Sequence, residues 1–253
     1  MTISQEAREL PPPPAGLLRD ASLFLDFDGT LVVIAARPDA VAVEHRLHEL
    51  LQKLGDRLDG RLAIISGRAA ANIRILLDHP ALVIAGSHGA EILRPGSAIV
   101  AHKAQPLDAM AQALLQGLTA RYPQVLIERK PLGLALHYRQ VPEAEAECRR
   151  VAEQIGARAG LTAQPGKKVI ELRMPGADKG TALTALMQEP PLQGGRPIFI
   201  GDDETDEAGF RAAAALGGVG VLVGDMRATA AAFRLADVDR TLAWLEGATR
   251  GTP

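Results

Sequence analysis

The sequence has few aromatic residues, one cysteine and no large excess of charge of either sign. Its 253 residues include one Trp, two Tyr and five Phe, so aromatics make up 3% of the chain. A nucleic-acid binder that stacks bases on aromatic rings would be expected to have more of them. The formal net charge is −2, with 28 basic and 30 acidic residues, so no global basic field attracts DNA or anionic lipid. We therefore expect neither a nucleic-acid nor a membrane partner.

The single cysteine, Cys148, excludes an intrachain disulfide. We interpret it as a packed thiol on a helix over residues 143–153. The sequence has no run of 18 apolar residues, and its first ten residues lack the apolar segment of a signal peptide. We predict a cytoplasmic protein and a monomer. The apolar fraction of 47% suffices for a sizeable core, and the length fits one or two domains.

The chain is predicted to consist of a tail, a core in two parts and an insertion. Residues 1–19 are interpreted as a flexible tail, because the four prolines at 11–14 favour polyproline II and block helix. Short apolar runs, typical of strands buried on both faces, follow at residues 22–26, 62–66, 81–86, 197–201 and 219–223. Helical patterns accompany them at residues 43–54, 69–77, 179–187, 206–216 and 228–235. This alternation predicts an α/β fold with a doubly wound, mostly parallel sheet, formed by residues 20–100 and 176–253.

Residues 101–175 have a different pattern, in which polar and apolar side chains alternate. One predicted strand places Glu128 and Lys130 on one face and Arg129 on the other, and a second strand has Glu171 on its polar face. Strands of this kind form a sheet that is covered on one side only. We predict a smaller α+β domain inserted into the core, with its polar face available to a ligand.

Polar groups follow four of the apolar runs, where an open α/β sheet has its ligand crevice. The first group is the segment DFDGT at residues 26–30. Asp26 and Asp28 would repel each other there, and a divalent cation is a natural compensation. A turn built from Asp and Gly at the end of a strand is the alternative. A calcium loop is excluded because Leu31 stands where that loop needs glycine.

The other three groups are less specific when taken singly. Ser66 precedes a predicted helix, where it would cap the helix or bind an anion. Lys179 lies in a first helical turn, where it opposes the helix macrodipole by about 0.3–1 kcal/mol unless an anion offsets it. A solvated surface lysine is the alternative. The segment GDDETDE at residues 201–207 is either an acidic helix start or a set of hard oxygen ligands for Mg²⁺.

Taken in this order, the four groups resemble the motifs of the haloacid dehalogenase-type phosphatase superfamily, whose fold is a doubly wound core with an inserted cap. The position of the insertion resembles the type 2 cap arrangement. More specific segments resemble the trehalose-6-phosphate phosphatase family over about residues 20–246. These segments are GSHGAE at 86–91, ERK at 128–130, GLALHYR at 133–139 and ELR at 171–173.

The resemblance implies a phosphoric monoester hydrolase that converts trehalose 6-phosphate to trehalose and phosphate, the last step of trehalose biosynthesis. By this resemblance Asp26 attacks phosphorus and forms an aspartyl phosphate. Asp28 protonates the leaving sugar oxygen and then deprotonates the attacking water. Ser66 and Lys179 hold the remaining phosphate oxygens.

The resemblance also implies a metal site and a sugar site. Mg²⁺ is expected at the Asp26 carboxylate, the Asp28 backbone carbonyl and Asp202, with Asp203 and Asp206 beside it to orient water or Lys179. The cap is expected to bind the sugar through Glu128, Lys130 and Glu171. Further candidates for substrate binding, in the core and the cap, are Gly67, Arg68, His88, His137 and Arg173. The alternatives are an exposed ion pair for Glu128 and Lys130, and structural histidines at positions 88 and 137.

Two other functions stay open. Another sugar-phosphate phosphatase of the superfamily, acting on sucrose phosphate or a mannosyl-phosphoglycerate, would have the same core motifs. A regulatory domain without catalysis, docked on the synthase that makes the substrate, is disfavoured. A decayed enzyme would be expected to have lost at least one member of a set that is complete here, namely Asp26, Asp28, Ser66, Lys179 and Asp202.

Overall fold

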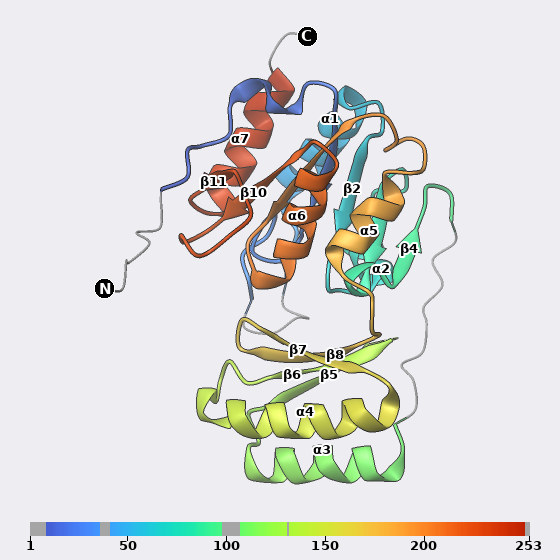
Figure 1. Ribbon diagram of the computed structural model, residues 1–253, viewed down its shortest axis with the longest axis vertical. Helices are drawn as coiled ribbons and strands as arrows, with labels where there is room; N and C mark the ends of the chain where they lie inside the picture. Colours follow the sequence, from blue (N-terminus) through green and yellow to red (C-terminus); the bar gives the residue numbers. More distant parts are fainter. Residues whose placement is uncertain (1–8, 36–40, 98–106, 131, 251–253) are drawn as a thin grey trace.

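The computed structural model describes residues 9–35, 41–97, 107–130 and 132–250, and these ranges contain two separate sheets (Figure 1). The larger sheet has seven strands in the order β11-β10-β9-β1-β2-β3-β4, and the smaller has four in the order β5-β6-β8-β7. We call the larger sheet with its helices the core, and the smaller sheet with α3 and α4 the cap. The predicted α/β fold with a mostly parallel central sheet is confirmed.

The apolar runs of the sequence form the middle of the core. Six of its strands run parallel, namely β1 (Ala21–Leu25), β2 (Leu62–Ile65), β3 (Val83–Gly86), β9 (Arg196–Gly201), β10 (Val219–Val223) and β11 (Phe233–Leu235). β4 (Glu91–Leu93) pairs antiparallel with β3. All residues of β1 and β2 are buried, as expected for strands that are covered on both faces.

Helices cover both faces of the larger sheet. α1 (His45–Arg57), α2 (Ala70–Leu77) and α7 (Val238–Arg250) contribute to one apolar cluster, and α5 (Lys179–Leu186) and α6 (Glu207–Ala215) contribute to another. Successive residues of β1 alternate between the two clusters, with Leu23 in the first and Phe24 in the second. No helix in the described part of the chain is both long and apolar enough to cross a membrane.

The predicted helix over residues 228–235 is wrong. Its last three residues form the edge strand β11, which pairs with β10, while the residues before it form turns and irregular backbone. The alanines at 228 and 230–232 favour a helix locally, but pairing with a long-range partner strand overrides that propensity. The last helix of the core, α7, was not predicted. It begins after Asp237, whose carboxylate accepts a hydrogen bond from the backbone N–H of Arg240 at 2.7 Å.

The polyproline stretch at residues 11–14 packs on the core rather than extending from it. The carbonyl of Pro13 accepts a hydrogen bond from the indole of Trp244 at 3.0 Å, and Leu17 and Leu18 are buried in the core cluster. The stretch is thus held by apolar burial and by its own carbonyl groups, in contrast to the flexible tail expected from sequence. The first eight residues of that predicted tail lie outside the described residues.

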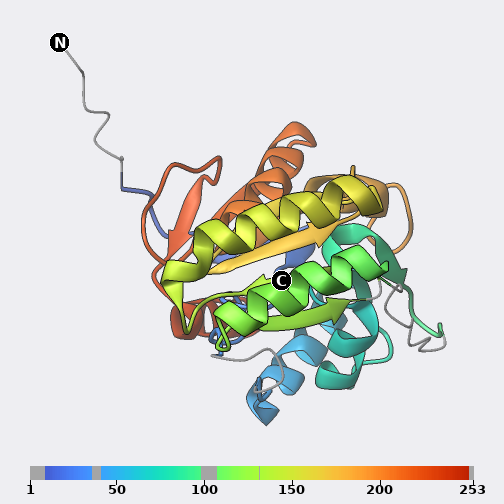
Figure 2. The ribbon, with the colours of Figure 1, turned by 90° about the horizontal axis from the view of Figure 1, so that it is seen from below.

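The cap is an antiparallel sheet with helices on one face. Its strands are β5 (Leu126–Lys130), β6 (Gly133–His137), β7 (Thr162–Gly166) and β8 (Val169–Arg173). α3 (Ala109–Arg121) and α4 (Glu145–Ala159) lie side by side across this sheet (Figure 2). Cys148 is buried in α4 as a free thiol, as predicted. The other face of the sheet is turned toward the carboxyl ends of the core strands (Figure 1).

Candidate active site

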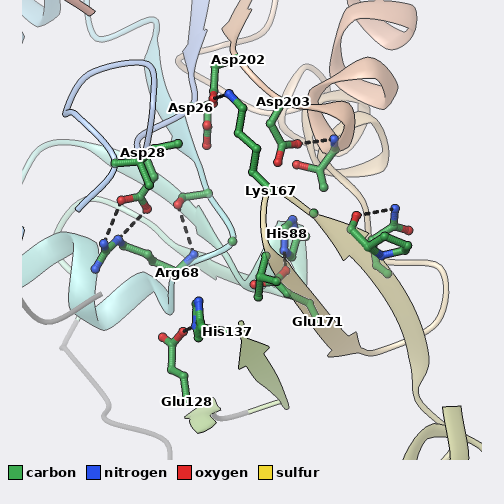
Figure 3. Close-up of a pocket in the computed structure, with 18 of the residues that line it drawn as sticks. Asp26, Asp28, Arg68, His88, Glu128, His137, Lys167, Glu171, Asp202 and Asp203 are labelled. Carbon is green, nitrogen blue, oxygen red and sulfur yellow. Dashed lines mark hydrogen bonds and ion pairs between the residues drawn. The ribbon is translucent and has the colours of Figure 1, made fainter. Parts of the chain in front are cut away.

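Most of the predicted site residues meet in one pocket between the core and the cap (Figure 3). Nine of the predicted residues line the core side of this pocket, namely Asp26, Asp28, Ser66, Gly67, Arg68, His88, Lys179, Asp202 and Asp203. The cap side is lined mainly by Glu128, Lys130, His137, Arg139, Gln164, Lys167 and Glu171. Two predicted residues do not line it: Asp206, which is fully buried, and Arg173. Arg173 lines a smaller neighbouring pocket and donates to the Gln164 side chain at 3.0 Å.

Three buried carboxylates gather around a buried lysine at the floor of the pocket. Asp26 follows β1, and Asp202 and Asp206 follow β9, and each of the three offers an oxygen within 4.8 Å of the others. The ammonium of Lys179 lies 2.8 Å from Asp26 Oδ1 and 2.6 Å from Asp206 Oδ1. Lys179 is only 3% exposed, so it is not a solvated surface lysine. The two carboxylates offset the unfavourable position of its charge at the start of α5.

Two carboxylates of this cluster, Asp26 and Asp202, resist ionisation. Burial raises the pKa of Asp26 well above its usual range. Lys179 lowers this pKa, whereas the charges of Asp206 and Asp202 raise it. Burial and the charge of Asp206 raise the pKa of Asp202 to about 6. Burial alone would lower the pKa of Lys179, but Asp206 and Asp26 raise it above its ordinary value. The cluster is short of positive charge, and a divalent cation would supply it.

The residues present fit a hard divalent cation. Asp206 is already occupied, because its Oδ1 faces Lys179 and its Oδ2 accepts from the backbone N–H groups of Asp202 and Asp203 at 2.9 Å each. Asp26 and Asp202 therefore offer the carboxylate oxygens that Mg²⁺ prefers. A side chain at Gly29 would collide with the Asp202 carboxylate, so this glycine, at φ +84°, keeps the space open.

The geometry separates the two acids that sequence reasoning placed beside the metal. Asp203 lines the pocket, but its carboxylate accepts from the backbone N–H of Thr205 at 2.5 Å and is not part of the carboxylate cluster. Asp206 is part of the cluster and holds Lys179 and the backbone of Asp202. Asp206 thus fixes the shape of the loop that presents Asp202.

Asp28 faces Arg68 instead of the acidic cluster. Its two carboxylate oxygens accept from the guanidinium at 2.6 and 2.8 Å (Figure 3).

Ser66 is buried in the pocket, where its hydroxyl accepts from the backbone N–H of Arg68 at 3.2 Å. It does not cap α2, whose N-cap residue is Ala69.

The cap presents its polar face to the pocket. Glu128 contacts the His137 ring at 2.9 Å on this face. Lys130 contacts Glu171 and donates to the backbone carbonyl of Gly67 at 2.9 Å. The side chain of Lys130 is only 12% exposed and reaches across to the core, so an exposed ion pair on one strand does not describe it.

Sequence reasoning missed Lys167. This residue lies in the turn between β7 and β8, and its ammonium lies 3.0 Å from Asp202 Oδ2 (Figure 3). β7 was not predicted from the sequence, so the hairpin that carries Lys167 was not recognised. Once Thr162–Gly166 is known to be a strand that pairs with β8, Lys167 is found in the turn between them, where its side chain reaches the core.

Comparison with known proteins gives relatives over almost the whole chain. The family model described as trehalose-phosphatase matches residues 24–239. A trehalose-6-phosphate phosphatase of Escherichia coli (strain K12) is 39% identical over 225 residues, which cover 88% of this chain and 84% of the relative. A Sinorhizobium fredii protein named "Probable trehalose-phosphate phosphatase" is 41% identical over 207 residues, covering 80% and 77%. The solved C-terminal domain of C. albicans trehalose-6-phosphate phosphatase has the same fold, with a TM-score of 0.78, 23% identity and coverage of 95% and 98%.

Proposed function

Because the chain belongs to the trehalose-phosphatase family and is a phosphoric monoester hydrolase, we propose that it hydrolyses trehalose 6-phosphate to trehalose and phosphate with Mg²⁺. One observation carries this proposal. A single pocket has the Asp26–Lys179 cluster on its core side and the polar face of the cap on the other. The first side suits a phosphate group and the second a polyhydroxylated sugar.

The proposed reaction begins with Asp26. One of its oxygens, Oδ1, is held by Lys179 at 2.8 Å, which orients the carboxylate at the end of β1. A carboxylate oxygen of Asp26 forms a bond to phosphorus while the bond from phosphorus to the sugar oxygen breaks, which leaves an aspartyl phosphate. Water then attacks this phosphorus, the bond to Asp26 breaks, and inorganic phosphate is released.

Asp28 supplies and removes the protons. It gives a proton to the sugar oxygen as this oxygen leaves, and later takes one from the attacking water. Both oxygens of Asp28 are engaged by Arg68 in this structure, so Asp28 must leave Arg68 before it acts. A phosphate dianion competes for the guanidinium through charge-assisted hydrogen bonds, and substrate binding itself would therefore release Asp28.

The remaining residues hold the phosphate and the cation. Ser66 and Lys179 line the pocket and would donate to the phosphate oxygens. Asp26, Asp202 and the backbone carbonyl of Asp28 would hold Mg²⁺. When bound, Mg²⁺ reduces the repulsion between the Asp26 carboxylate and the phosphate dianion.

Phosphate release from trehalose 6-phosphate by the purified chain tests this proposal. The assay is run with Mg²⁺, after removal of metal with a chelator, and after Mg²⁺ is restored. We expect release in the first and third samples and a loss of at least about 100-fold in the second, since the metal offsets several kcal/mol of charge repulsion. Absence of release with Mg²⁺ would refute the substrate, and full activity after chelation would refute the metal.

Substitution of Glu128→Ala is expected to separate sugar recognition from chemistry. Loss of a hydrogen bond to a charged group costs about 1.5–3 kcal/mol, so kcat/KM for trehalose 6-phosphate should fall about 10- to 100-fold. Hydrolysis of p-nitrophenyl phosphate, which carries no sugar, should change by less than about twofold. The matched control is Arg129→Ala, because Arg129 is the next residue of β5 and is exposed on its other side. Equal losses on both substrates would contradict a sugar-binding role.

A further inference from the structure

His88 occupies a strained turn directly after β3. Ser87, His88 and Gly89 have φ values of +49°, +58° and +103°, in a region that L residues rarely adopt. Two backbone hydrogen bonds tie this turn to the loop after β2, from Ser87 N–H to the Arg68 carbonyl at 2.7 Å and from His88 N–H to the Ser66 carbonyl at 2.9 Å. Strain of this kind persists where the surroundings hold it in place, and it frequently marks a functional position.

The ring of His88 fills the space beside Gly67. A Cβ atom on Gly67 would lie 2.7 Å from Nε2 of His88 and 2.8 Å from Cε1, closer than side chains pack. Gly67 does not have a positive φ, so its own backbone conformation does not require glycine. The absence of a side chain at Gly67 is instead what allows the His88 ring to reach the pocket.

His88 and Gly67 together contact the two charged residues of the cap that face them. Nε2 of His88 contacts one oxygen of Glu171, and Lys130 contacts the other oxygen (Figure 3 shows the His88–Glu171 contact). Lys130 also donates to the Gly67 carbonyl at 2.9 Å. Burial alone would raise the pKa of Glu171, but Lys130 and His88 hold it well below its usual range. Glu171 is therefore a carboxylate that is oriented from the core as well as from the cap.

We propose that His88 is a positioning residue, which seats the cap on the core and fixes the Glu171 carboxylate for the sugar. This inference rests on the proposed function, in which the polar face of the cap binds the sugar, because Glu171 lines the same pocket on that face. Each carboxylate oxygen has two lone pairs, so the contacts with His88 and Lys130 leave acceptor capacity for sugar hydroxyls. Sugar recognition and docking of the cap on the core then depend on the same contact, that of His88 with Glu171. His88 and Gly67 act on the sugar through Glu171, in place of the direct binding expected from sequence.

Two substitutions disturb this contact in different ways. His88→Asn keeps a residue that tolerates a left-handed backbone, but its side chain is too short to reach Glu171. Gly67→Ala keeps the imidazole and displaces it. For both variants we expect kcat/KM for trehalose 6-phosphate to fall about 10- to 100-fold, mainly through KM, with p-nitrophenyl phosphate hydrolysis within about threefold of the unsubstituted chain. Gly55→Ala is the control, because a Cβ there meets no atom within 4 Å.

A double-mutant cycle then tests whether His88 acts through Glu171. In a Glu171→Ala background, His88→Asn is expected to cause no further loss, because the contact it removes is already absent. Additive losses, or an equal loss on p-nitrophenyl phosphate, would overturn the inference. The inference would also be overturned if both variants were as active as the unsubstituted chain on trehalose 6-phosphate. That result would leave the proposed function intact. An unsubstituted chain that hydrolyses p-nitrophenyl phosphate but not trehalose 6-phosphate would refute the proposed function, and with it the assignment of Glu171 to the sugar.

Discussion

Substitution of Asp26→Asn is expected to lower kcat for trehalose 6-phosphate by at least about 10⁴-fold, the scale seen when a covalent nucleophile is removed. The amide has nearly the shape of the carboxylate but cannot form the aspartyl phosphate. Folding should survive, because burial raises the pKa of Asp26 and already disfavours its charge in the folded chain. Its neighbours Asp202 and Asp206 also lose a repulsive partner. We therefore expect a melting temperature equal to or above that of the unsubstituted chain.

The combination of lost turnover and retained stability distinguishes a nucleophile from a structural acid. Steady-state phosphate release and thermal unfolding are measured on the same preparation. Asp59→Asn is the matched control, because Asp59 is an exposed aspartate with a positive φ that asparagine accommodates. Residual activity of Asp26→Asn above about one hundredth of the unsubstituted value would assign the attack on phosphorus to another group.

Substitution of Lys179→Met is expected to lower the free energy of unfolding by about 3–5 kcal/mol, the usual cost of leaving a buried charge without its partner. Lys179 is 3% exposed and is the ion-pair partner of both Asp26 and Asp206. The variant should also lose phosphatase activity, since the same ammonium is proposed to hold a phosphate oxygen. Denaturant unfolding of the two chains at one pH measures the difference.

The loss in free energy of unfolding caused by Lys179→Met, which we call the deficit, should change with pH in a predictable direction. Burial already raises the pKa of Asp26 in the folded chain, and loss of the lysine raises it further. Between the unfolded and the folded pKa the folded chain binds more protons, so its stability falls as pH rises. The deficit should therefore shrink toward acidic pH and widen toward neutral pH. Lys53→Met, which removes an exposed ion pair with Glu49, should change stability by less than about 1 kcal/mol at either pH.

The core side of the pocket was predictable because it follows from the layout of a parallel sheet. Asp26, Ser66 and Asp202 each follow a buried apolar run, and the carboxyl ends of parallel strands meet at one edge. The polar face of the cap was predictable from alternation, since Glu128 and Lys130 are two residues apart on one strand. In the first case the end of a strand determines where the side chain lies, and in the second the two-residue periodicity of a strand determines which face it is on.

The features that were not predicted depend on contacts between distant parts of the chain. A run of acids cannot show which member points inward, and only the turn of residues 204–206 places Asp206 in the cluster and turns Asp203 back onto Thr205. The pairing of Asp28 with Arg68 joins residues 40 positions apart. The contact between His88 and Glu171 joins residues 83 positions apart in the sequence. No local pattern encodes partners at such separations.

The most direct test of the account is kcat/KM of the purified chain, with Mg²⁺, on trehalose 6-phosphate, sucrose phosphate and a mannosyl-phosphoglycerate in parallel. These esters share the phosphate chemistry and differ in the part that the cap would bind. We expect kcat/KM to be at least about 100-fold higher on trehalose 6-phosphate, because Glu128, Lys130 and Glu171 would contact its sugar. An equal or higher kcat/KM on either of the other two esters would contradict the account.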